Sequence, residues 1–169
     1  LGKLNKNKGI EDLIDVYANL LKKENFNKLE PNLLIGGVGS KNYISSINKR
    51  ISNKNIQFLG YVEDRYNFFN SIKVFIFPSY SEGLGLVLLE AMSHGVLCIT
   101  RDVTPMNSII KNGENGFLFK DNNELIEKIE KAINLNSSEK DKIVKSALEK
   151  IEKSYSIMQM YLSIDKAYN

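Results

Sequence analysis

Short apolar runs alternate with segments of helical spacing, and this alternation is the strongest constraint on the fold. The runs cover residues 32–35, 56–59, 73–77, 96–100 and 116–119. Apolar runs of four or five residues between turn residues are typical of buried strands, and strands that alternate with helices are typical of a parallel sheet. The sequence therefore predicts an α/β fold in which helices cover both faces of a parallel sheet.

The composition excludes several classes of protein. A chain of 169 residues with 43% hydrophobic residues has enough apolar material for the core of a single domain. Cys98 is the only cysteine, which excludes an internal disulfide framework and favours a reducing compartment. His94 is the only histidine, which argues against a histidine-rich metal site or a complete Ser-His-Asp triad. Lysines alternate with glutamates over residues 120–153, as on a solvated helix face, so nucleic acid is not expected as a partner.

The segment after the apolar run 73–77 is the first candidate for a binding site, because ligands of such sheets bind beyond the carboxyl ends of the strands. Gly83 and Gly85 frame the predicted start of a helix over residues 85–93. Free N–H groups and the helix dipole at such a start favour an anion or a hydroxyl-rich ligand. A plain tight turn into the helix would use the same glycines, so both interpretations stay open.

Two glutamates belong to this segment. Glu90 lies in a run of Leu, Val, Ala and Met, where a carboxylate is rarely buried without a partner. It either pairs with a lysine or arginine of the chain or accepts hydrogen bonds from the hydroxyls of a ligand. Glu82 fits a helix-capping acid as well as a ligand contact.

The spacing of these glutamates, E-G-x-G-x-x-x-x-E after Phe-Pro-Ser, resembles the E-x7-E signature of the retaining nucleotide-sugar glycosyltransferases called group 1 or family 4. Further blocks similar to segments of that family follow the same order, at residues 2–10, 34–39, 58–62 and 112–117. The resemblance implies one half of a GT-B fold. Residues 1–169 would form its C-terminal, donor-binding, Rossmann-like domain, with final helices at about 137–169, and the N-terminal acceptor domain would lie outside this chain.

The resemblance also assigns roles to residues. It implies that Glu82, Gly83, Leu84 and Gly85 bind the donor sugar, that Lys3, Lys8 and Leu86 bind the diphosphate, that Glu90 binds the ribose, and that Tyr61 and Val62 lie at the base. Glu82, Lys3 and Lys8 would be the catalytic residues. Because lysines and a helix N-terminus meet the charge of the leaving group, neither a metal ion nor another cofactor is expected.

Two departures from the family pattern bear on the site. Lys3 stands where the family usually has arginine, so the charge is kept and the bidentate geometry is lost. After the run 96–100, Thr104-Pro105 and Asn107-Ser108 replace the usual Gly-Gly and Pro-Glu pairs. Since that loop borders the sugar site in the family, the identity of the sugar stays open.

The implied function is transfer of a hexosyl unit, with retention, from a nucleotide sugar such as a UDP- or GDP-hexose to a glycan or lipid-linked acceptor, in polysaccharide, glycolipid or capsule synthesis. The start at Leu1-Gly2-Lys3 without methionine suggests a piece of a longer protein. The isolated chain is therefore expected to bind nucleotide and to transfer nothing. The implied location is cytoplasmic, with peripheral association of the full-length protein at the inner membrane face left open.

Two other functions stay open. One is a non-catalytic nucleotide- or sugar-binding module of the same fold. The other is an α/β interaction domain in which Glu90 pairs with Lys3 or Lys8. For the remaining candidates the sequence predicts structural roles: His94 packs at a helix end, Cys98 is a core residue, and the apolar residues between 154 and 168 expose a docking patch.

Overall fold

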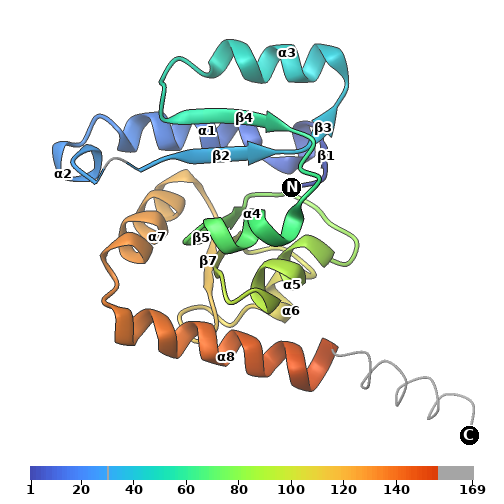
Figure 1. Ribbon diagram of the computed structural model, residues 1–169, viewed down its shortest axis with the longest axis vertical. Coiled ribbons are helices and arrows are strands. Elements are labelled where there is room, and N and C mark those ends of the chain that lie inside the picture. Colours follow the sequence, from blue (N-terminus) through green and yellow to red (C-terminus); the bar gives the residue numbers. More distant parts are fainter. Residues whose placement is uncertain (30, 156–169) are drawn as a thin grey trace, which may run out of the picture.

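The computed structural model describes residues 1–29 and 31–155, and it confirms the predicted alternation of strands and helices (Figure 1). The strands are β1 (Lys3–Leu4), β2 (Leu33–Gly36), β3 (Val38–Gly39), β4 (Ile56–Gly60), β5 (Val74–Phe77), β6 (Leu97–Arg101) and β7 (Phe117–Phe119). The helices are η1 (Lys6–Lys8), α1 (Ile10–Leu20), α2 (Glu24–Asn27), α3 (Lys41–Arg50), α4 (Arg65–Ser71), α5 (Leu86–Ser93), α6 (Met106–Ile109), α7 (Asn122–Asn134) and α8 (Ser137–Tyr155).

All paired strands are parallel, as predicted, but they form three hydrogen-bonded groups rather than one sheet. β1 pairs with β3, β2 pairs with β4, and β6 pairs with both β5 and β7. Apolar runs show where strands are but not which strands are neighbours, so the sequence pattern could not show this division. β1 and β3 were also not predicted, because two residues are too few to show a periodicity.

The position of β6 explains its composition. All five residues from Leu97 to Arg101 are buried, and the strand has partners on both edges. A strand covered on both faces is expected to be a continuous apolar run rather than an alternating one. Cys98 lies in this strand with 1% of its surface exposed, which confirms the predicted core role. Burial raises the pKa of its thiol, so it stays protonated near neutral pH.

The helices pack around these strands in two groups (Figure 1). α1 contacts α3 and α7, and their side chains join β2 and β4 in one apolar cluster. α5 contacts β6 and α8, and its Leu88, Ala91 and Met92 are fully buried in a second cluster. His94 caps the C-terminus of α5 and stacks on Phe69 with ring centroids 5.3 Å apart, which confirms its predicted packing role.

Two expectations concern the end of the chain. The final helices were expected at about 137–169; α8 begins at Ser137 and is described to Tyr155, and the rest of that range lies outside the described residues. The predicted docking patch falls almost wholly on residues 156–169, which lie outside the described residues. Of the helices that the structure describes, none is long and apolar enough to cross a membrane.

Candidate functional site

The loop between β5 and α5 forms the base of the candidate site. Pro78 and Ser79 are buried directly after β5, and Gly85 is the N-cap of α5 with a φ of 64°. A Cβ on Gly85 would lie 2.8 Å from the terminal methyl of the flexible Met106 side chain, and the positive φ would strain any other residue, so the backbone conformation favours glycine here. No side chain of the described residues caps the first turn of α5, and the Leu88 N–H donates to the Gly85 carbonyl at 2.8 Å, so the N–H groups of Leu86 and Val87 are open to a ligand. A Cβ on Gly83 would meet no atom within 4 Å.

Glu82 forms an ion pair with Lys8, and the backbone around both residues fixes it. Lys8 Nζ lies 2.5 Å from Glu82 Oε1, and only 14% of the Glu82 side chain is exposed. The Tyr80 N–H donates to the Asn7 carbonyl at 2.8 Å, which joins the β5–α5 loop to η1. A Cβ on Gly9 would lie 2.3 Å from the Pro78 carbonyl oxygen, so the Lys-Gly sequence permits this close approach.

Glu90 forms an ion pair with Arg65, the first residue of α4. The Arg65 Nε donates to Glu90 Oε1 at 2.7 Å, and its Nη2 donates to the other carboxylate oxygen. This two-point contact is the strongest geometry for an arginine and a carboxylate. Glu90 is therefore paired within the chain, as one of the two interpretations expected. Its partner is Arg65, so the prediction that Lys3 or Lys8 would be the partner was wrong. The side chains of Arg65 and Glu90 are 40% and 31% exposed, so a ligand can still reach the carboxylate.

Arg101 is a positioning residue that the sequence did not identify. It ends β6 with 5% of its surface exposed, and its Nε donates to the Pro78 carbonyl at 3.0 Å. Its Nη1 donates to the Lys120 carbonyl at 3.0 Å, and its guanidinium lies 3.9 Å from the centre of the Tyr80 ring. Arg101 thus fixes the backbone that leads to Glu82. The only signal in the sequence was a single charge at the end of an apolar strand.

Both glutamates belong to the segment that follows β5, where the sequence predicted the site: Glu82 lies in the β5–α5 loop and Glu90 lies in α5. The hydrogen bond that the Tyr80 hydroxyl donates to Asp12 raises the pKa of Tyr80 in the same region.

The other predicted site residues are mostly exposed. Lys3 lies on β1 with an exposed side chain. Tyr61, Leu84 and Leu86 are 75%, 71% and 67% exposed, and Val62 lies close to Gly36. Of the predicted site residues, the structure places Lys8 and Glu82 in direct contact. The partner of Glu90, which is Arg65 of α4, was not predicted from the sequence.

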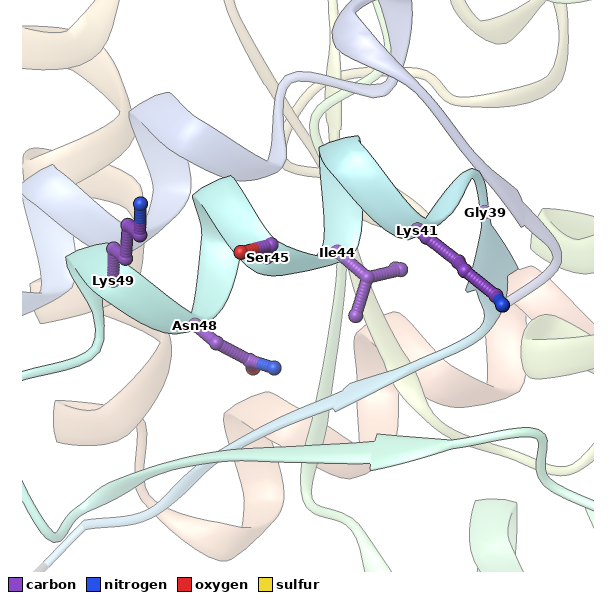
Figure 2. A pocket seen from close by; sticks show the side chains of 6 residues that line it. All are labelled: Gly39, Lys41, Ile44, Ser45, Asn48 and Lys49. Carbon is purple, nitrogen blue, oxygen red and sulfur yellow. The ribbon is translucent and has the colours of Figure 1, made fainter.

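A hollow of about 580 Å³ lies on α3 (Figure 2). Its lining residues come from the end of β3 and from α3: Gly39, Lys41, Ile44, Ser45, Asn48 and Lys49. These residues include none of the ion-paired side chains described above. The candidate site is therefore the group of residues around the β5–α5 loop.

Comparison with known proteins gives the chain its family. The sequence pattern of the glycosyl transferases group 1 matches residues 1–150. The capsular polysaccharide biosynthesis glycosyltransferase CapM of Staphylococcus aureus is 32% identical over 173 aligned residues, which cover 100% of this chain and 44% of CapM. The chain thus spans less than half the length of this relative.

Solved structures agree in fold. Anabaena Alr3699/HepE in complex with UDP and glucose superposes with a TM-score of 0.84 at 20% identity, covering 99% of this chain and 47% of HepE. The C-terminal domain of a glycosyl transferase group 1 family protein, LpcC of Francisella tularensis, superposes with a TM-score of 0.76 at 22% identity, covering 93% of this chain and 84% of that domain. The predicted Rossmann-like half of a GT-B fold is confirmed, and the chain belongs to the glycosyl transferases group 1 family.

Proposed function

We propose that this chain is the donor-binding half of a glycosyltransferase that transfers a hexosyl unit, with retention, from a nucleotide diphosphate sugar to a glycan or lipid-linked acceptor. The observation that supports it most is the placement of Glu82 and Glu90, each paired with a cation, on either side of an uncapped helix N-terminus. The complex of HepE with UDP and glucose and the role of CapM in capsular polysaccharide biosynthesis favour the same class of donor and acceptor.

Glu90 is proposed to bind the ribose hydroxyls. An ionised carboxylate has about four lone-pair positions, and Arg65 occupies two of them. The remaining positions can accept hydrogen bonds from two neighbouring hydroxyls, while Arg65 keeps the carboxylate oriented. In this proposal Arg65 is a positioning residue that acts through Glu90.

Glu82 and the backbone from Gly83 to Gly85 are proposed to bind the sugar. The open space beside Gly83 allows a bulky ligand to approach the backbone there. Lys8 contacts Glu82 directly, so one lysine can face the sugar-binding carboxylate and the diphosphate together. Lys3, Lys8 and the N–H of Leu86 would stabilise the charge on the leaving diphosphate without a metal ion.

The remaining roles are proposed from the family resemblance. Tyr61 and Val62 would lie at the base, through backbone contacts. The acceptor would bind to the N-terminal domain of the full-length protein, in the cytoplasm or at the inner membrane face. The chain alone would bind nucleotide without transferring sugar.

Calorimetric titration of the full-length protein with UDP, GDP and ADP tests the proposal. We expect one of the three to bind and its binding to be lost in Glu90→Ala but kept in Glu63→Ala, an exposed acid just before α4. Binding without transfer to any acceptor would favour the non-catalytic module. If Glu90→Ala lowered stability and left nucleotide affinity unchanged, the interaction domain would be favoured.

A further inference from the structure

The positive charge of the chain is concentrated in one segment. Residues 31–62 contain no acidic residue and four basic ones, Lys41, Lys49, Arg50 and Lys54, all of which are exposed. This leaves 19 of the 23 basic residues and all 20 acidic residues for the other parts of the chain, so the net charge of +3 comes from this segment. A block of charge of one sign attracts a partner of the opposite sign.

Helix α3 carries three of the four basic residues, and it differs from the other described helices of ten or more residues. Each of α1, α7 and α8 has an acidic residue in its first turn, where a negative charge stabilises the helix dipole. The first turn of α3 has none, and its first residue is Lys41. A lysine at this position opposes the dipole, so helix stability does not explain it. A residue that breaks a local rule in this way is expected to have a function.

The two lysines of α3 are open to a partner, whereas its arginine is not. Arg50 lies 2.8 Å from Asp15 and 3.9 Å from Glu11, both of α1. Lys41 and Lys49 form no ion pair with the other residues that the structure describes. The basic face of α3, which we define by Lys41 and Lys49, therefore keeps its charge for an external anion.

The shape of this basic face fits small anionic groups. Lys41 and Lys49 are eight residues apart, or about 12 Å along the helix axis. The hollow on α3 lies between them, and its other side chains are Ile44, Ser45 and Asn48 (Figure 2). A hydroxyl and an amide donate hydrogen bonds to phosphate oxygens, and the lysines supply the charge.

The position of α3 in the molecule leaves the basic face accessible. Ile47, on the inner side of the helix, is fully buried, and α3 contacts α1. α3 lies at the top of the molecule in Figure 1 and α8 lies at the bottom. The basic face can therefore meet an extended surface without contact between that surface and α8.

The residues of the basic face favour a lipid surface over the other polyanions. Proteins that bind single-stranded nucleic acid stack bases on aromatic side chains, and none lines the hollow. Lysine is depleted in interfaces between proteins. It is a strongly hydrated point charge, which suits attraction to many headgroups rather than two-point recognition of one carboxylate.

We propose that the basic face of α3 binds the surface of a membrane that contains anionic phospholipids. The headgroup phosphates would lie against Lys41 and Lys49, and the helix would stay outside the hydrocarbon region. The proposal depends on the charges of α3. It does not rest on the donor or the reaction proposed above, so either can fail without the other.

Sedimentation of the full-length protein with lipid vesicles tests the proposal. The vesicles contain phosphatidylcholine alone or phosphatidylcholine mixed with phosphatidylglycerol. The double variant Lys41→Gln/Lys49→Gln is compared with Lys142→Gln/Lys145→Gln, which removes the same charge from two exposed lysines of α8. All four substitutions are on exposed side chains, so the fold should be unchanged.

We expect each lysine removed from α3 to lower partitioning onto the mixed vesicles about fivefold, so the α3 double variant should lose about twenty-fivefold. The α8 double variant should lose less than about twofold, and neither should differ from the unchanged protein on phosphatidylcholine alone. Equal losses in the two double variants would overturn the proposal, because only net charge would then matter. So would failure of the unchanged protein to bind the mixed vesicles.

Nucleic acid is the other polyanion to be tested. If the α3 double variant lost binding to polyuridylic acid and kept its binding to the mixed vesicles, the partner would be a nucleic acid and the proposal would be overturned.

A spin label shows which face meets the vesicle. It is attached to Asn48→Cys on α3 or to Ser138→Cys on α8, both exposed positions, while Cys98 is buried and is not expected to react. On addition of mixed vesicles we expect the label at residue 48 to lose its accessibility to a water-soluble nickel chelate and the label at residue 138 to keep it. Loss at residue 138 alone would assign membrane contact to another surface and overturn the proposal.

Discussion

The two ion pairs at the candidate site stabilise their glutamates in different ways. Glu82 lies on a loop whose backbone is fixed from several sides, by Gly9 against Pro78, by Tyr80 hydrogen-bonded to Asn7 and by Arg101 below. Glu90 lies on α5, and its position depends on the two-point contact with Arg65. The Glu82 side chain is 14% exposed and that of Glu90 is 31% exposed.

The two carboxylates are therefore held in position in two different ways. At Glu82 the backbone determines the geometry, so we expect its cation Lys8 to be free to serve a ligand. At Glu90 the helix provides the position and Arg65 provides the orientation. The variants below change one pair while leaving the other intact.

Arg101→Met is expected to have the largest effect. It should disturb the loop that carries Glu82 and leave the Arg65–Glu90 pair intact. The free energy of unfolding should fall by about 3 kcal/mol, because the buried carbonyl of Pro78 and the partly buried carbonyl of Lys120 lose a charged donor. Urea denaturation of the chain measures this. Arg50→Met is the matched control, since its pairs with Asp15 and Glu11 are on the surface and should be worth less than about 1 kcal/mol. Equal losses in both variants would contradict a positioning role for Arg101.

Glu90→Gln and Glu82→Gln should distinguish binding of the nucleotide from binding of the sugar. We expect Glu90→Gln to weaken binding of the preferred nucleoside diphosphate about thirtyfold, the equivalent of about 2 kcal/mol for a hydrogen bond to a charged group. Glu82→Gln should leave that affinity nearly unchanged and weaken only binding of the nucleotide sugar. Calorimetry on the full-length protein compares them. A larger loss of nucleoside diphosphate affinity in Glu82→Gln would reverse the assignment.

Lys8→Met should weaken the diphosphate contact specifically. We expect about tenfold lower affinity for the nucleoside diphosphate, since a charge-assisted contact of about 1.4 kcal/mol is removed, and an unchanged affinity for the nucleoside. Lys6→Met is the control, because Lys6 lies in the same helix η1 and is exposed. If the two lysine variants behave alike, Lys8 contributes only to the general positive charge.

The three family-motif residues in these ion pairs were singled out from the sequence, because the E-x7-E spacing and the Lys8-Gly9 segment resemble the family pattern. Ligand binding by Glu82, Glu90 and Lys8 stays a prediction. Arg65 and Arg101 were not predicted, because each acts through a contact with a segment more than twenty residues away. A periodic pattern records which face of an element is buried and contains no information on such long-range partners.

The same reasoning applies to the fold. Apolar runs predicted the positions of β2, β4, β5, β6 and β7. The pairing of β2 with β4 and of β5 with β6 was not predictable, since it depends on the order of strands in space. The register of β1 with β3 is seen only in the structure.

Arg65→Lys should have a smaller effect than the changes at Glu90 and Lys8. Lysine keeps the charge beside Glu90 but cannot contact both carboxylate oxygens in one plane. We expect nucleoside diphosphate affinity to fall about threefold, and stability to change by less than about 1 kcal/mol because the pair is partly exposed. Calorimetry and urea denaturation check the two values. An increase in affinity would mean that Arg65 competes with the ligand for Glu90.

Removal of divalent metal ions is expected to have the smallest effect. In our proposal Lys3, Lys8 and the N-terminus of α5 supply the positive charge that faces the diphosphate, and cations already in place gain little from an added ion. Calorimetric affinities should therefore agree between EDTA and Mg²⁺. The Lys8→Met variant makes the test sharper. If Mg²⁺ restores the nucleoside diphosphate affinity of this variant, a metal ion can replace the lysine. The diphosphate site would then depend less on the Lys8–Glu82 pair than we propose.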